Sequence, residues 1–317
     1  MSIDLSKATA LSDQYGNIVQ LELGGKVIWQ LITATDEPPA IFEVAKQTKT
    51  TYAGETKYEN EQFILFDIYP KKGGTVQVTY GGLTKTVKDT SGAEIPNAVQ
   101  VYFGTFNGVS DSVATPASGR LTIEGAYRGY GMGSYGGYSG KSSGTYAPCI
   151  TNVIDFGNPV YIGTQTFSGC TSLALTSLPS GVTTIGSFAF YGCTGITSMS
   201  LPSGITSIED FAFSKTNIKS MTIPASVTSL GDQSLACYCR DYYNTTTGDY
   251  TFANFRMLGT TPPVMEGFGS TSNATATAFG SRDIYVMGII TVLKGCGETY
   301  KTAERWSAIA DKIVEAS

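Results

Sequence analysis

The residue types that most often carry catalysis are scarce in this sequence. It has no histidine, so the commonest general base, the commonest metal ligand and the Ser/His and Cys/His nucleophile pairs are all excluded. The six cysteines are few for a disulfide framework, and only Cys237 and Cys239 lie close together. No second pair stands at metal-site spacing from them. We therefore expect buried free thiols, no metal site and no cofactor.

Carboxylates are the remaining groups that could perform acid–base chemistry. The candidates are scattered over expected strands and turns without a shared motif, whereas a glycosidase needs two carboxyl groups at a defined separation. A carboxylate-dependent glycosidase is therefore the least favoured of the functions considered, and we expect a protein that is not an enzyme. The candidates are Asp67, Asp89, Asp111, Glu124, Asp155, Glu209 and Asp210.

Side chains suited to ligand contact occur in three places. The first is the Gly/Tyr-rich segment 127–148, with Tyr130, Tyr135 and Tyr138. Its composition is typical of a flexible linker or packing loop, and this is the interpretation we favour. The same composition is typical of the ligand-binding loops of antibody paratopes.

The second place lies within a repeat region, and the third follows it. Ser198, Ser200 and Thr222 alternate with apolar residues, as outward positions of a strand do. Small hydroxyls at such positions can bind a ligand or can merely keep the strand surface hydrated, and we favour the second role. A polar and aromatic cluster follows, and it is as typical of a contact surface as of a packed loop. Its members are Tyr238, Arg240, Asp241, Tyr242 and Tyr243.

Composition and charge exclude several classes of partner. Charged residues make up 15% of the 317 residues, against roughly 25% in ordinary soluble domains, and the net charge is −5. A basic face for nucleic acid is therefore not expected. No apolar stretch reaches 18 residues, so we expect no membrane insertion, and the start lacks the basic and apolar regions of a secretory signal.

The first two segments read as β-structure. In residues 1–35, Val19, Leu21 and Leu23 alternate with polar residues, and the alternation resumes at Val27 after Gly24-Gly25, which predicts an arm and a hairpin. A lone hairpin is marginal in water, so it should contact a neighbour or another subunit. Residues 36–126 show short strands and turns without helical periodicity, which predicts a β-sandwich resembling bacterial immunoglobulin-like domains.

Residues 149–317 contain an internal repeat of 22 or 23 residues. Apolar, aromatic and Leu-Pro positions recur in step, as a stack of coils that share one core requires. Phenylalanines of successive coils should therefore lie on one another. The recurring positions are Ile162, Ile185, Ile208 and Leu230; Phe167, Phe190, Phe213 and Leu235; and Leu178, Leu201 and Ile223.

The unit from Ile185-Gly186 through Ala189-Phe190 and Cys193 to Leu201-Pro202 resembles the BspA-like leucine-rich repeats of bacterial surface proteins. The resemblance extends to the end of the chain, where it implies a helical cap with Tyr300, Trp306, Ile309 and Ile313 over the open end of the stack. It implies adhesion or recognition at a bacterial surface.

The expected fold is thus mainly β: an N-terminal arm and hairpin, an Ig-like sandwich, and a leucine-rich-repeat solenoid with a helical cap. Residues 5–29 also resemble the start of structural proteins from phages of gut bacteria. We expect a virion fibre, decoration or receptor-binding subunit that forms a homo-oligomer. It would contact other virion subunits through its N-terminal region and a bacterial surface glycan or protein through its repeats. The alternative is an extracellular adhesin on the bacterial cell surface.

Overall fold

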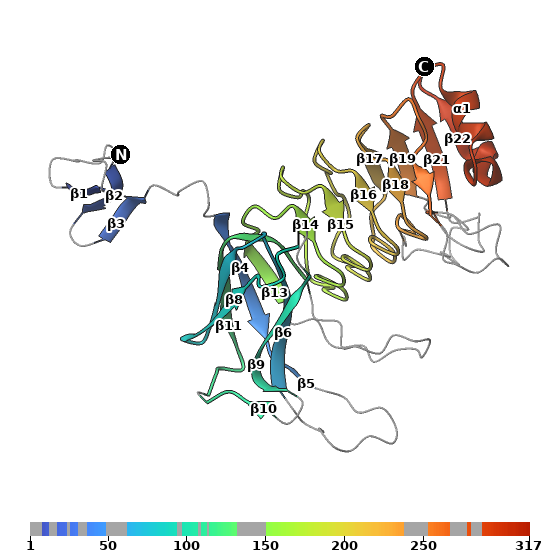
Figure 1. Ribbon diagram of the computed structural model, residues 1–317. Helices are drawn as coiled ribbons and strands as arrows, with labels where there is room; N and C mark the ends of the chain where they lie inside the picture. Colours follow the sequence, from blue (N-terminus) through green and yellow to red (C-terminus); the bar gives the residue numbers. More distant parts are fainter. Residues whose placement is uncertain are drawn as a thin grey trace, which may run out of the picture.

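Nearly all the regular elements of the computed structural model are strands, which confirms the prediction of a mainly β protein (Figure 1). The strands form sheets of three, ten, five and four members. The residues that the structure describes are 8–12, 18–23, 26–30, 37–48, 62–93, 97–106, 109–112, 114–131, 150–237, 253–266, 278–279 and 287–317.

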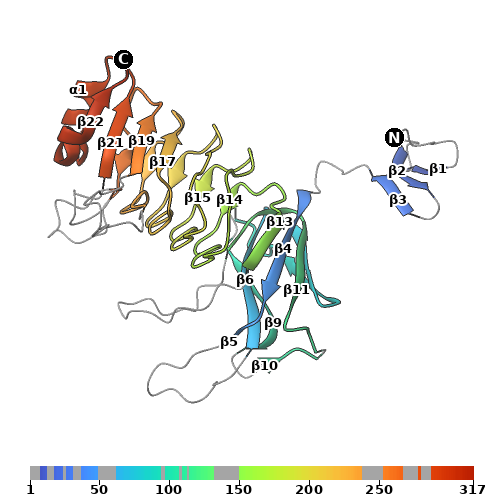
Figure 2. The ribbon, with the colours of Figure 1, turned by 180° about the vertical axis from the view of Figure 1, so that it is seen from behind.

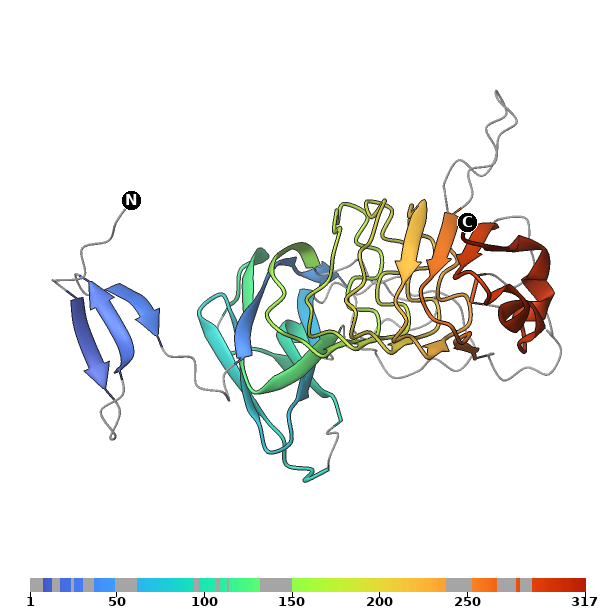
Figure 3. The ribbon, with the colours of Figure 1, turned by 90° about the horizontal axis from the view of Figure 1, so that it is seen from above.

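The N-terminal region forms its own antiparallel sheet in the order β1-β2-β3. Strands β2 (Ile18–Leu23) and β3 (Lys26–Gln30) are the predicted hairpin, and β1 (Ala8–Ser12) adds the preceding arm. Figure 3 shows this sheet standing apart from the rest of the molecule.

Two sheets packed face to face follow. Residues alternate between inside and outside along these strands, and the inward aromatic rings meet between the sheets: Phe42 lies 6.0 Å from Phe66, and Tyr80 lies 5.7 Å from Phe103. The first sheet has the order β13-β4-β11-β7-β8, and β10-β9-β6-β12 begin the second, with β5 beside β6.

The strands of these two sheets are two to nine residues long. They are β4 (Glu37–Ala45), β5 (Gln47–Thr48), β6 (Gln62–Pro70), β7 (Thr75–Tyr80), β8 (Leu83–Lys88), β9 (Val99–Phe106), β10 (Val109–Ser110), β11 (Ser118–Gly125), β12 (Tyr127–Gly131) and β13 (Ile150–Asp155).

Strand pairing crosses the expected boundaries at residues 127 and 149. Residues 127–131 are strand β12, which pairs antiparallel with β6 and parallel with β14 (Tyr161–Ile162), so one sheet runs from the sandwich into the repeats. Gly129 lies between Tyr69 and Tyr161 in this sheet, and their rings meet over it at 4.9 Å. Strand β13, expected in the repeats, is instead an edge strand of the sandwich. Composition hid β12 because Gly and Tyr dominate it.

The repeats stack in the register that their spacing predicts. The two-residue strands β14, β15 (Thr184–Ile185), β16 (Ser207–Ile208), β18 (Ser229–Leu230) and β20 (Val264–Met265) pair in parallel, one per coil. We call their face the ladder face.

One aromatic column runs through the core of the stack, as predicted. The ring of Phe190 lies 5.1 Å from that of Phe167 and 5.2 Å from that of Phe213, with interplanar angles of 15° and 4°. All three side chains are fully buried. Phe42 of the sandwich lies 6.3 Å from Phe167, so the sandwich covers the first coil and closes that end of the core.

The opposite side of the stack carries the four-stranded parallel sheet β17-β19-β21-β22 (Figure 2). Its strands are longer than those of the ladder face and lie in the C-terminal half of the stack. They are β17 (Ser220–Ile223), β19 (Ala253–Met257), β21 (Met287–Val292) and β22 (Ile313–Glu315).

The C-terminal cap differs from the predicted helix. Helix α1 (Gly297–Thr302) and a 3₁₀ helix (Trp306–Lys312) are followed by strand β22, so Ile313 and Val314 are in a strand. β-Branched residues favour this conformation, and β21 offers an edge for pairing. The predicted capping residues Tyr300, Trp306, Ile309 and Ile313 are buried, as expected. Neither helix of the described chain has the length or apolar character needed to cross a bilayer.

Candidate binding groove

The four-stranded sheet directs alternate side chains into solvent. Along β17, Met221 and Ile223 are buried, whereas Ser220 and Thr222 are exposed. Along β19, Phe255 points into the core and Arg256 outward. Because the strands are parallel and in register, outward residues of neighbouring strands form rows across the sheet.

Two rows can be followed across the strands. One contains Thr222, Arg256 and Thr291, which pair in register on β17, β19 and β21. The other joins Ser220 to Asn254, whose Oδ1 accepts a hydrogen bond of 2.8 Å from the Ile289 amide. The Asn254 carboxamide thereby bonds to the next strand and keeps its two N–H donors on the sheet surface.

An open groove of about 590 Å³ lies over these rows. Its floor and edges are partly apolar, with Met199, Leu201, Pro224 and Leu258 among the lining residues. Among the described lining residues, Arg256 is the one that carries a charge. The polar side chains are Thr176, Ser198, Ser200, Ser203, Ser220, Thr222, Asn254, Arg256 and Thr291.

The groove hydroxyls make no hydrogen bond to any described residue. This holds for Ser198, Ser200, Ser220, Thr222 and Thr291, each of which lines the groove. Hydroxyl groups that both donate and accept are thus available in rows along one surface.

The ladder face uses the same residue types differently. There Thr183, Thr206 and Thr228 follow one another at repeat spacing. Each donates its hydroxyl to the backbone carbonyl of the previous coil, at 3.4, 3.1 and 3.3 Å. These hydroxyls are therefore used internally to join coil to coil.

The structure brings together three of the predicted contact residues: Ser198, Ser200 and Thr222 all line the groove. Sequence reasoning missed Asn254, Arg256 and Thr291, because the 22- or 23-residue period ends before them. The alternation of Ala253, Phe255 and Met257 with polar residues was a signal that could have found β19.

Tyr130 was wrongly placed among the exposed contact residues. It is fully buried, its hydroxyl donates to the Phe156 carbonyl at 3.0 Å, and its ring lies 5.0 Å from Phe42. It is therefore a core residue that joins the sandwich to the repeats. The other predicted contact residues lie outside the described part of the chain. They are Tyr135, Tyr138, Tyr238, Arg240, Tyr242 and Tyr243.

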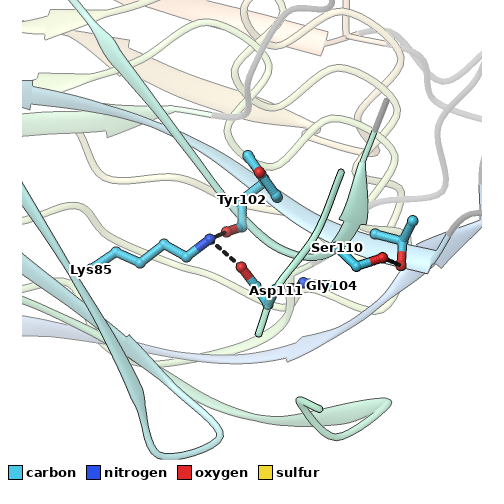
Figure 4. Close-up of polar contacts among 6 residues, drawn as sticks. Lys85, Tyr102, Gly104, Ser110 and Asp111 are labelled. Carbon is cyan, nitrogen blue, oxygen red and sulfur yellow. Dashed lines mark hydrogen bonds and ion pairs between the residues drawn. The ribbon is translucent and has the colours of Figure 1, made fainter. Parts of the chain in front are cut away.

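The carboxylates considered for catalysis are separate from the groove, and several serve the local structure. Asp111 shows this most clearly (Figure 4). Its side chain is 7% exposed. It accepts a hydrogen bond of 2.5 Å from Lys85 Nζ and one of 2.8 Å from the Gly104 amide, and these bonds join β8 to the turn between β9 and β10. Four others accept hydrogen bonds from nearby backbone amides. The pairs are Glu209 with Ser187, Asp210 with Asp232, Asp155 with Gly157, and Asp89 with Gly73 and Ser91.

The thiols that can be placed are not arranged for chemistry. Cys170 and Cys193 are buried free thiols, as predicted, Cys237 is buried, and Cys296 is half-buried. Burial raises the pKa of the Cys170 thiol to about 12 and that of Cys193 above it, so neither is a thiolate near neutral pH. Cys149 and Cys239 lie outside the described residues, among which no group of ligands suits a metal ion.

Comparison with known proteins identifies the repeats. Residues 160–260 match the family model described as BspA type leucine rich repeat region, in six copies. The repeat part of the chain is therefore of the BspA leucine-rich type. The match extends past Leu230, where the regular spacing ends, and includes β19 of the groove.

Two solved structures are similar to the chain. The leucine-rich repeat protein TpLRR of T. pallidum is 22% identical over 50% of this chain and 62% of its own, with a TM-score of 0.31. A leucine-rich repeat protein from Bacteroides ovatus is 17% identical over 48% of this chain and 44% of its own, with a TM-score of 0.27. This chain thus spans less than two thirds of either. No curated protein matches it.

Proposed function

We propose that this chain, whose residues 160–260 are BspA-type leucine-rich repeats, is a non-enzymatic recognition protein that binds its ligand in the groove over β17, β19 and β21. One observation carries the proposal. One row of threonines on the ladder face, Thr183, Thr206 and Thr228, donates its hydroxyls to the backbone of the neighbouring coil, whereas the groove hydroxyls have no partner in the described chain and are available to a ligand.

The chemistry of the groove supports binding over catalysis. The described residues of its lining include neither a carboxylate nor a thiol, the usual general acids and nucleophiles. Hydrolysis of a glycoside would require two carboxyl groups facing one bond. Hydroxyls, one carboxamide and one guanidinium over an apolar floor can hold a ligand by hydrogen bonds and contact area.

Two biological settings fit this role, and we give them equal weight. In one, the chain is a fibre, decoration or receptor-binding subunit of a phage virion, attached to other subunits through β1–β3. In the other, it is an adhesin on a bacterial cell surface. Both expect a bacterial surface glycan or protein at the groove and a homo-oligomer held by the N-terminal sheet. Antibodies against the chain would label purified virions in the first setting and intact cells in the second.

A groove-filling substitution tests the proposal. Ser220→Trp places an indole in the groove from an exposed position, and Thr86→Trp places one on the outer face of β8 as a matched control. Fluorescent full-length protein would be titrated onto a panel of gut bacteria. We expect at least a tenfold loss of apparent affinity for Ser220→Trp and none for Thr86→Trp, with equal melting temperatures. Equal binding by both variants would overturn the proposal.

A further inference from the structure

Arg256 is an isolated cation in the centre of the groove. It lies on β19 between Thr222 and Thr291 in the same row and is exposed. No described residue pairs with its guanidinium by hydrogen bond or ion pair, and the groove lining contains no acidic residue.

The guanidinium has a preferred partner. Its planar array of N–H donors fits a carboxylate through two parallel, charge-assisted hydrogen bonds, which are roughly twice as strong as neutral ones. Neighbouring strands lie roughly 4.8 Å apart, so Thr222 and Thr291 stand on either side of Arg256 in the row. The row thus provides a charged centre with a hydroxyl on either side.

The rest of the lining favours a ligand rich in hydroxyls. Ser198, Ser200 and Ser220 carry hydroxyls that donate and accept without a fixed direction, as the hydroxyls of a sugar do. An extended peptide binds a sheet mainly through main-chain hydrogen bonds to a strand edge, whereas the rows of this groove present side chains. Apolar lining residues such as Met199 and Leu258 can cover the C–H surface of a sugar ring.

We infer that the groove binds an acidic glycan, with Arg256 pairing with a sugar carboxylate and the Ser and Thr hydroxyls with its ring hydroxyls. The inference rests on the proposed function and adds the ligand class and the residue that sets specificity. Charge selection is assigned to Arg256, and general affinity to the hydroxyl rows.

Matched polysaccharides test the charge. Polygalacturonate and its fully methyl-esterified form have the same ring hydroxyls and differ in the carboxylate. They would be immobilised beside sialyllactose and lactose, and full-length protein would be titrated over them. We expect binding to a carboxylate member of these pairs and at least tenfold weaker binding to its neutral counterpart.

Variants assign the selection to one side chain. Arg256→Gln removes the charge, Arg256→Lys keeps it without the planar donor array, and Arg120→Gln makes the same charge change at an exposed position on β11. We expect a loss of tenfold to a hundredfold for Arg256→Gln, a smaller loss for Arg256→Lys, and none for Arg120→Gln. Because Arg256 and Arg120 are exposed, all three variants should have the melting temperature of the wild type.

The outcomes separate the two proposals. If the protein binds the acidic and the neutral glycans equally, and only Ser220→Trp weakens that binding, the acidic-glycan inference fails and the proposed function stands. Capture of acidic peptides with no response to any glycan would also overturn the inference, and would make the ligand a protein. If binding to bacteria survives Ser220→Trp, the proposed function fails as well.

Discussion

One row of threonines on the ladder face and the hydroxyl residues of the groove face differ in their hydrogen-bond partners. On the ladder face, Thr206 and Thr228 donate their hydroxyls to the backbone of the preceding coil. On the groove face, Ser220 and Thr222 make no hydrogen bond to any described residue. Composition alone does not separate hydroxyls that hold the structure together from hydroxyls that are available to a ligand, whereas the hydrogen-bond partners of each hydroxyl do.

Both faces depend on one aromatic column, so its disruption should have the largest effect. Phe190→Ala leaves a cavity between Phe167 and Phe213 and should lower the free energy of unfolding by about 3–5 kcal/mol. Denaturant titration would measure it. A loss below about 1 kcal/mol would mean that the coils do not share one column, and the comparison of two faces would lose its basis.

The groove face should show the next largest effect, in binding alone. Ser220→Ala with Thr222→Val removes two free hydroxyls. This double variant should weaken binding to bacteria by about tenfold or more, because each lost hydrogen bond costs about 0.5–1.5 kcal/mol. The free energy of unfolding should stay within about 0.5 kcal/mol of the wild type. A comparable loss of stability would show that these hydroxyls have structural partners.

The ladder face should give the reverse result. Thr206→Val with Thr228→Val keeps the side-chain shape and removes two hydrogen bonds to the neighbouring coil. We expect a loss of about 1–2 kcal/mol in the free energy of unfolding and unchanged affinity for bacteria. If this variant bound less while retaining its stability, the ligand would contact the ladder face.

A smaller effect concerns a buried acid at the turn that follows β18. Burial, with the neighbouring Asp210 carboxylate, raises the pKa of Asp232, and its Oδ1 has no partner in the described chain. The folded protein therefore holds this proton more tightly than the unfolded chain does. Its contribution to stability is greatest at acid pH and falls as pH rises through the raised pKa.

Asp232→Asn should remove that part of the pH dependence. The variant should unfold at a slightly higher urea concentration than the wild type at pH 7 and show a flatter profile between pH 4 and pH 7. Glu266, whose Oε1 accepts from Ser229, is exposed, so Glu266→Gln is a control that should keep the wild-type profile. An unchanged profile for Asp232→Asn would show that the acid is not perturbed.

The predictable part of the fold was the part with a strict period. Each coil is too small to bury its own apolar face, so the spacing of Phe167, Phe190 and Phe213 determines how the coils stack. The same logic placed Ser198, Ser200 and Thr222 on an outward surface. Tyr130 was misjudged because its neighbours are Gly and Tyr, and composition does not tell which of several tyrosines is buried.

The remainder of the groove lay beyond the period. Met221 pairs with Phe255 across 34 residues, so no repeat spacing links Thr222 to Arg256. At the C-terminus, Ile309 and Ile313 are spaced as on a helix, yet pairing with β21 extends the sheet to Ile313. Inter-strand pairing decided both cases, and it depends on parts of the chain distant in sequence.

Photo-crosslinking from the two faces tests the central claim most directly. A photoreactive amino acid would replace Ser220 on the groove face or Thr206 on the ladder face, and the full chain would be irradiated on bacteria to which it binds. We predict that position 220 captures surface material and position 206 does not. Capture from position 206 alone, or equally from both, would contradict the assignment of binding to the groove.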